Sequence, residues 1–174
     1  NTDAAGAGNA SGPISLFASD IDIDDALILD ASDGAGGADG VITIATAPTT
    51  GDLDGNSFMF GLSVDSGTSA TDLSNATLSD LDFLSITASV ASLGDTTLGA
   101  GDTHTGFIGT GLLVTTTVGD LTLNGDISTT GEGNAGSVSL TVANSIQLAA
   151  GGAVGPNTVT ISTDGATSDA DISI

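Results

Sequence analysis

Apolar residues alternate with Thr, Ser or Asp in short runs along most of the chain, and clusters of Gly, Asp and Asn separate the runs. A period of two places successive side chains on opposite faces of a β-strand, and Gly, Asp and Asn are typical turn residues. The pattern therefore predicts an almost wholly β chain of short strands. The clearest runs are Ile14–Leu16, Ile21–Ile23, Val41–Ile44, Leu84–Thr87, Leu121–Leu123, Val138–Leu140, Ile146–Leu148, Val159–Ile161 and Ile172–Ile174.

One segment also admits a helical interpretation. Between Ser69 and Leu84 the apolar positions Leu73, Leu78 and Leu81 give the nearest approach to a helical period in the chain. The segment is rich in Ser, Thr and Asp, however, which are poor helix formers. A short helix or loop here remains an alternative to strands.

The alternation also predicts which side chains form the core. Burying a large aliphatic side chain contributes about 1.5 to 3 kcal/mol, whereas burying an unpaired carboxylate is very costly. We therefore expect Ile, Leu and Val to face inward and Asp, Thr and Ser to face solvent. The residues predicted to point into the core are Ile21, Ile23, Leu121, Leu123, Val138, Leu140, Ile146, Leu148, Val159 and Ile161.

Three segments of the chain resemble one another. One runs from Asp120 to Leu140 (DLTLNGD, GEGNA, VSL) and a second from Asp20 to Ile44 (DIDIDD, GAGGADG, VITI). The third appears when the end of the chain is written before its start, as 171–174 followed by 1–16. The matching halves predict that the two ends complete one repeat, either within a longer tandem array or between neighbouring subunits. The expected self-assembly residues are Asp171, Ile172, Ser173, Ile174, Asn1, Thr2 and Asp3.

Short strands at a recurring interval indicate stacked units rather than one closed sheet. Coils of roughly 20 to 25 residues, stacked about 4.8 Å apart, are typical of a parallel β-helix. We expect a single β-solenoid segment over residues 1–174 with roughly seven or eight coils. Its better-patterned coils cover 14–47 and 112–174, and its centre, 48–111, is irregular. The alternative is a β-sandwich subunit of the pilin type, completed by a donor strand from its neighbour.

The fixed charge of the chain is entirely negative. It has 22 Asp and Glu, no Lys or Arg, and a formal net charge of −22. Without a basic patch to neutralise phosphate, nucleic acid and anionic lipid are disfavoured as partners. An apolar fraction of 39% and a mean hydropathy of +0.33 argue against disorder. The absence of cysteine excludes disulfides and thiolate metal sites. Apolar stretches are too short to span a bilayer, so we expect no membrane insertion.

Carboxylates gather between residues 20 and 39. Strand alternation places Asp20, Asp22 and Asp24 on one face, and Asp33 and Asp39 flank a glycine-rich turn. Oxygen ligands of this kind suit Ca²⁺. These five aspartates are the candidate metal ligands, and a solvated outer face with a flexible turn is the alternative.

The sequence predicts no catalytic site. The sole histidine, His104, has no Cys nearby and no Ser in a nucleophile-elbow context, so we expect it on a surface loop. Paired carboxylates can serve glycoside hydrolysis. Sugar sites usually need aromatic platforms and cationic groups as well, and the chain has no Trp, Tyr, Lys or Arg. We therefore expect a protein that is not an enzyme.

The units DIDIDD…GVITI, DLTLNGD…GNAGSVSL and VSLTVANSIQL resemble the repeat regions of filamentous-haemagglutinin-like adhesins and exoproteins, which are large secreted bacterial surface proteins. The resemblance covers about half of the chain. It implies a right-handed parallel β-helix, an extracellular or cell-surface location, and a structural or adhesive role. The chain departs from that family in having no basic residue and no identifiable secretion domain.

Two functions from different classes follow. The first is a structural repeat unit of an extracellular bacterial or archaeal fibre, surface layer or adhesin stalk, which assembles head to tail with copies of itself. The alternative is a calcium-dependent adhesin or carbohydrate-binding module, whose acidic face recognises a polysaccharide or a cell surface. The matching ends favour the first, because a self-contained binding domain has no need of them.

Overall fold

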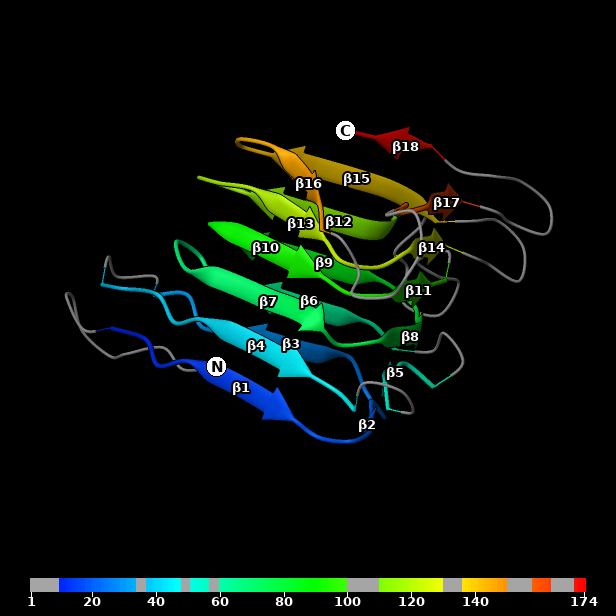
Figure 1. The fold of residues 1–174 in the computed structure, drawn as a ribbon. Coiled ribbons are helices and arrows are strands. Elements are labelled where there is room, and N and C mark those ends of the chain that lie inside the picture. Colours follow the sequence, from blue (N-terminus) through cyan, green and yellow to red (C-terminus); the bar gives the residue numbers. More distant parts are fainter. Residues whose placement is uncertain are drawn as a thin grey trace.

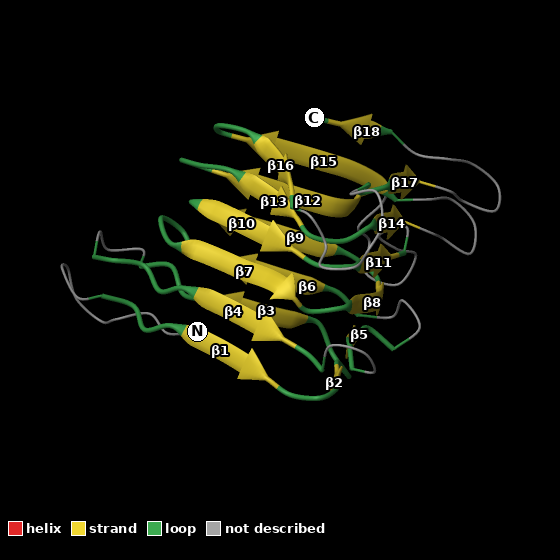
Figure 2. Cartoon of the chain, in the orientation of Figure 1, coloured by secondary structure: helices red, strands yellow, loops and turns green. Residues whose placement is uncertain are grey.

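The computed structural model describes residues 10–33, 37–47, 51–56, 60–99, 110–129, 136–149, 158–163 and 171–174. These residues form eighteen β-strands and no helix, as the two-residue alternation predicts (Figure 2). Consecutive strands fall into three sheets in strict rotation, so the described chain is a parallel β-helix (Figure 1). The β-sandwich alternative is wrong, because the strand pairings are parallel. Among the described residues, no helix is long and apolar enough to cross a membrane.

The three sheets, called A, B and C here, contain six strands each and define six coils. Sheet A is made of β1 (Ile14–Phe17), β4 (Ile42–Ala45), β7 (Ala70–Asn75), β10 (Val90–Leu93), β13 (Leu121–Leu123) and β16 (Ile146–Leu148). Sheet B is made of β2 (Ile21–Asp22), β5 (Leu53–Asp54), β8 (Leu78–Leu81), β11 (Thr96–Leu98), β14 (Ile127–Thr129) and β17 (Ile161–Thr163). Sheet C is made of β3 (Leu27–Asp30), β6 (Leu62–Asp65), β9 (Leu84–Ala88), β12 (Thr110–Thr116), β15 (Ser137–Val142) and β18 (Ile172–Ser173).

The core consists of aliphatic columns that run from coil to coil. In sheet C, for example, Leu112 pairs in register with Leu84 below it and Val138 above it, and all three are buried. Like side chains in adjacent coils therefore stack directly, and each strand presents its alternate residues to the interior. The fully buried large side chains are Ile42, Ile44, Leu53, Leu62, Leu73, Leu78, Leu81, Leu84, Ile86, Leu93, Leu98 and Leu112.

The predicted core list holds except at one position. Ile23, Leu121, Leu123, Val138 and Leu140 are buried. Ile21, Ile146, Val159 and Ile161 are half-buried and pack against the core. Leu148 is 58% exposed, so its predicted burial is wrong. Its strand β16 is the last in sheet A, and no further described coil covers it.

The described residues form fewer coils than predicted. The described strands make six coils rather than seven or eight, and the spacing of paired residues runs from 17 (Leu81 to Leu98) to 35 (Leu27 to Leu62). The corners cause this spread: the one between β4 and β5 has seven residues, 46–52, and that between β10 and β11 has two, 94–95. The matching sequence units start in different sheets, since Asp20 precedes β2 and Asp120 precedes β13.

The helical alternative for Ser69–Leu84 is wrong. The segment forms β7, β8 and the start of β9. Leu78 and Leu81 are three residues apart and both fully buried, because Asp80 adopts a positive φ of 50° and the register with β11 shifts there. Such a bulge inserts one extra residue and turns both leucines inward. The resulting spacing of three imitates a helix.

The expected irregular centre is continuous with the rest of the stack where it is described. Strands β5 to β11 occupy the same three sheets as their neighbours. Phe60 packs against the core, and the Phe83 ring lies where a side chain on Gly61 would otherwise be. Phe58, Met59 and Phe107 lie outside the described residues.

Candidate functional site

An aspartate column follows the corner between sheets A and B. The residue before each sheet-B strand is Asp20, Asp52, Thr77, Asp95, Asp126 or Thr160. The backbone N–H of Asp126 donates to the Asp95 carboxylate at 3.0 Å, and that of Thr160 donates to the Asp126 carboxylate at 2.7 Å. Each carboxylate thus satisfies a corner N–H of the coil above, which would otherwise lack a protein partner. Part of the acidic content therefore stabilises the corners.

The first three coils carry a denser cluster on the outer face of sheet B. Asp22 pairs in register with Asp54, and the Asp52 N–H lies 3.5 Å from the Asp20 carboxylate. The pKa of Asp20 is raised, chiefly by a side-chain hydrogen bond with Asp52. The pKa of Asp80 is raised by burial and by the negative charges of Asp54 and Asp52. Protons or cations that neutralise this cluster would relieve its like-charge repulsion.

Two of the predicted metal ligands lie at a different corner, between sheets C and A. The Asp39 carboxylate accepts hydrogen bonds from the Asp33 N–H and from the Thr68 hydroxyl, the latter at 2.7 Å. These contacts, above all those from Thr68, lower the pKa of Asp39. The Asp33 carboxylate accepts the Gly37 N–H. Both side chains organise the turn, as a carboxylate accepting backbone N–H groups does in many turns.

The five candidate ligands therefore fall into two places. Asp20 and Asp22 belong to the sheet-B cluster, Asp24 is exposed in the bend after β2, and Asp33 and Asp39 share the corner between sheets C and A. Among the described residues, no three or more His, Asp or Glu side chains are grouped so that they could hold a metal ion. Calcium binding stays a prediction.

A further carboxylate network was not expected from the sequence. Asp120 accepts hydrogen bonds from the Ser145 hydroxyl at 2.7 Å, the Asn144 amide at 2.6 Å and the Gln147 amide. The pKa of Asp120 is lowered, first by Ser145 and then by Asn144. In the sequence, Asp120 is followed one coil later by Asn144 and Ser145. The pairing can be predicted only when the length of that coil is known. The network ties β13 to β16.

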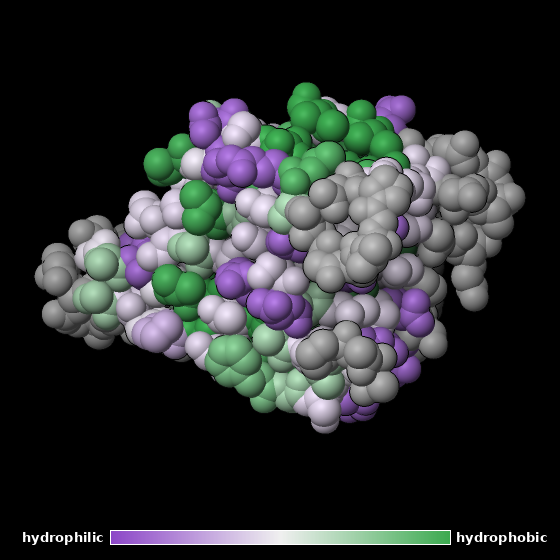
Figure 3. Space-filling view, viewed as in Figure 1, coloured by the Kyte–Doolittle hydropathy of each residue, from purple (hydrophilic) through white to green (hydrophobic). Residues whose placement is uncertain are grey.

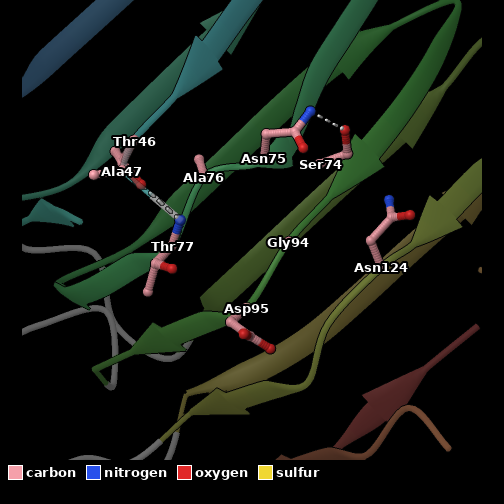
Figure 4. A pocket seen from close by; sticks show the side chains of 9 residues that line it. All are labelled: Thr46, Ala47, Ser74, Asn75, Ala76, Thr77, Gly94, Asp95 and Asn124. Atoms are coloured by element: carbon pink, nitrogen blue, oxygen red, sulfur yellow. Dashed lines mark hydrogen bonds between the residues drawn. The ribbon is translucent and has the colours of Figure 1, made fainter. Parts of the chain in front are cut away.

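The described surface also contains a hollow at the corner between sheets A and B (Figure 4). It arises where two short corners, 76–77 and 94–95, recede between longer ones. Asn75 donates to the Ser74 hydroxyl at 3.2 Å, and the Thr77 N–H donates to the Thr46 hydroxyl at 3.2 Å. The volume, about 220 Å³, lies below the range of about 300 to 1,000 Å³ of most ligand pockets. The lining residues are Thr46, Ala47, Ser74, Asn75, Ala76, Thr77, Gly94, Asp95 and Asn124.

The remaining predicted residues are divided by what the structure describes. Ile172 and Ser173 form β18 and pair with Val138 and Ser139 of β15, with Asp171 and Ile174 on either side of the strand. His104 and the N-terminal residues Asn1, Thr2 and Asp3 lie outside the described residues. The structure thus places the C-terminal members of the predicted self-assembly residues in the last described coil, and self-assembly stays a prediction.

Comparison with protein-family models, with curated proteins and with solved structures finds no match to this chain. The architecture and the chemistry of its surface therefore carry the functional inference by themselves.

Proposed function

We propose that this chain is a rigid structural segment of an extracellular fibre, surface layer or adhesin stalk, in which successive copies stack end to end along the solenoid axis. Three sheets, each hydrogen-bonded from coil to coil, give a stiff rod whose length grows with the number of coils. A chain without Lys or Arg also offers no site to trypsin-type proteases, which suits exposure outside a cell.

The observation that carries the proposal is the open core at the C-terminal end of the stack. Ile172 is 44% exposed and Leu148 is 58% exposed, although each continues an inward column. Val138 and Leu123, one coil below them, are fully buried. Figure 3 shows apolar surface gathered at this upper end of the molecule. Exposed apolar columns with an unpaired strand edge are a template for association.

The first described coil is also less buried than the coil above it. Ile14, Leu16 and Ile21 of the first coil are only half-buried, whereas their register partners Ile42, Ile44 and Leu53 are fully buried. The first described strand belongs to sheet A and the last to sheet C. A second copy placed on β16, β17 and β18 therefore continues the A, B, C rotation without an offset. A contact between unlike ends is heterologous and gives an open filament.

Charge also permits this contact. The first coil carries Asp20, Asp22 and Asp30 on its outer surface. The described outward side chains of the last coil include Gln147, Ser162 and Ser173, which are uncharged. Stacking thus brings the acidic rim of one copy against a rim of the next whose described residues include one carboxylate, the exposed Asp171, so the like-charge penalty is smaller than between two acidic rims.

End-to-end stacking is tested by placing a charge in the open core. Ile172→Asp should abolish fibres seen by electron microscopy, because a buried, unpaired carboxylate is very costly at the junction. Deletion of residues 171–174 should do the same. Ser162→Asp adds the same charge to the outer face of the same coil and should leave fibres intact, with circular dichroism confirming that both variants fold. Fibres of equal length in both variants, or discrete particles from the unmodified chain, would refute the proposal.

We also propose that Ca²⁺ strengthens the acidic coils, since 22 carboxylates have no basic side chain to balance them. A cation bound only by the folded state stabilises it by about 2.7 kcal/mol at a hundredfold excess over Kd. The melting temperature should therefore rise in millimolar Ca²⁺ relative to chelator at fixed ionic strength. Asp22→Asn should reduce this rise, and Asp72→Asn, on sheet A, should not. An unchanged melting temperature would refute specific calcium sites and leave only diffuse screening of the carboxylates by salt.

A further inference from the structure

The carboxylates are distributed unevenly along the stack. Fourteen of the 22 lie in residues 1–87 and eight in residues 88–174. On sheet C the outward column that begins with Asp30 and Asp65 continues as Thr87, Thr115 and Thr141. The neighbouring outward column passes through Ser85, Leu113 and Ser139. We call the six residues of these two outward columns on β9, β12 and β15 the hydroxyl face: Ser85, Thr87, Leu113, Thr115, Ser139 and Thr141.

The hydroxyl face carries no charge at any of its six positions, whereas at the level of β9 the outward faces of sheets A and B include Asp72 and Asp80. The first two coils of the same sheet present Asp30 and Asp65. On sheet A the corresponding outward residues include Asp72, and the corner between sheets A and B carries its aspartate column. At the centre of the face, Leu113 is 39% exposed, and Val118, in the corner beyond β12, is 70% exposed. A neutral, regular surface thus lies on a strongly anionic protein.

We infer that this face joins two copies of the chain side by side. A copy has no Lys or Arg to place against an acidic surface of another copy, so two copies repel each other wherever carboxylates meet. The hydroxyl face avoids that cost. Ser and Thr hydroxyls both donate and accept hydrogen bonds, so identical faces are complementary to each other. Sheets pack about 10 Å apart, and small side chains around one leucine allow this approach.

The size of the face decides when the contact is visible. Three strands about 4.8 Å apart, with two outward residues each, present on the order of 200 Å². A stable interface buries about 800 Å² per partner, so a single pair of copies associates weakly. In an end-to-end fibre, the contact recurs at every copy and the weak contacts add. Bundling of fibres therefore rests on the proposed function, whereas the pairwise contact does not.

The absence of cysteine allows a direct test of the pairwise contact. Thr115→Cys places one thiol on the hydroxyl face, and Thr97→Cys places one on the outer face of sheet B in the same coil. Both threonines are half-buried, so the two variants are matched. A bismaleimide is needed because facing sheets are about 10 Å apart, too far for a direct disulfide. Protein near 1 mM in about 1 M salt limits long-range repulsion.

We expect covalent dimers from Thr115→Cys to form at least about tenfold faster than from Thr97→Cys, since a tenfold preference corresponds to about 1.4 kcal/mol of association. Equal rates, or no dimer from Thr115→Cys, would overturn the inference. If Thr115→Asp instead lost adsorption to an insoluble neutral polysaccharide, and residue 115 did not cross-link, the face would belong to that partner and the inference would also fall.

Fibre images separate this inference from the proposed function. Thr115→Asp should give single filaments where the unmodified chain gives bundles, and Thr97→Asp should leave the bundles unchanged. Unmodified filaments that never bundle would refute the side-by-side contact and leave end-to-end stacking standing. Discrete particles that cross-link through residue 115 would refute end-to-end stacking and leave the side-by-side contact standing.

Discussion

Leu112→Ala should destabilise the folded chain by about 2 to 5 kcal/mol, the usual cost of truncating a buried leucine to alanine. Leu112 is fully buried in β12, and its register partners Leu84 and Val138 lie directly below and above it. Removing three carbon atoms leaves a cavity that these neighbours can fill only by moving whole strands. The backbone hydrogen bonds of the sheet resist that movement, so the cavity should persist.

The adjacent residue is the matched control. Leu113 is the same residue type in the same strand, but its side chain points outward and is 39% exposed. Leu113→Ala should therefore cost less than about 1 kcal/mol, in keeping with partial burial. Urea unfolding followed by circular dichroism gives both values. Equal losses in the two variants would mean that the assignment of inward and outward faces in sheet C is incorrect.

Hydrogen exchange should show where stability is lost. In a solenoid each coil contacts only its neighbours. A cavity in the coil formed by β10, β11 and β12 therefore weakens the adjacent coils before the distant ones. Loss of protection in Leu112→Ala should centre on β9, β12 and β15. This local response distinguishes a stack of coils from a globule with one common core.

The fold could be predicted from the sequence because the alternation is a property of each strand alone. Leu121–Leu123 and Val138–Leu140 show their inward residues without any knowledge of neighbours, and those residues are buried. Leu148 shows what alternation within one strand does not determine. Its position within β16 is inward, but burial also requires a coil above it, which a pattern within one strand does not report.

Corner lengths explain the remaining errors in the fold. A corner of two residues and one of seven both return the chain to the next sheet, so the coil period varies and the number of coils cannot be read from an average. At Asp80 a single residue with positive φ changes the inward spacing from two to three. This single bulge gives the segment an inward spacing that resembles a helical period.

The acidic residues could be found in the sequence, but their grouping could not. Asp22 and Asp54 become neighbours only through the stacking of β2 on β5. Asp33 and Asp39, expected as metal ligands, instead accept hydrogen bonds from backbone N–H groups at a turn. Both roles use the same carboxylate chemistry, and only the corner geometry separates a turn-organising aspartate from a ligand.

Gly136→Ala should destabilise the fold by about 1 to 3 kcal/mol or more, the usual range for overpacking a tight site. A Cβ atom at Gly136 would lie 2.7 Å from the Gly99 oxygen and 2.7 Å from both the nitrogen and the Cα of Gly111. All of these are backbone atoms of stacked coils, so no side-chain rotation relieves the clash. The coil containing β15 would have to lift away from the one below it.

Gly12→Ala is the control and should act in the opposite direction. No heavy atom lies within 4 Å of the Cβ position at Gly12. Alanine there restricts the unfolded chain and should stabilise the fold by up to about 1 kcal/mol. Thermal melting of the two variants measures the difference. If the melting temperature of Gly136→Ala equalled or exceeded that of Gly12→Ala, the coils would not approach each other closely at this corner. The close approach of the coils explains why Gly99, Gly111 and Gly136 are glycines. Without side chains, consecutive coils keep strand-pairing distance where the chain turns from sheet B into sheet C.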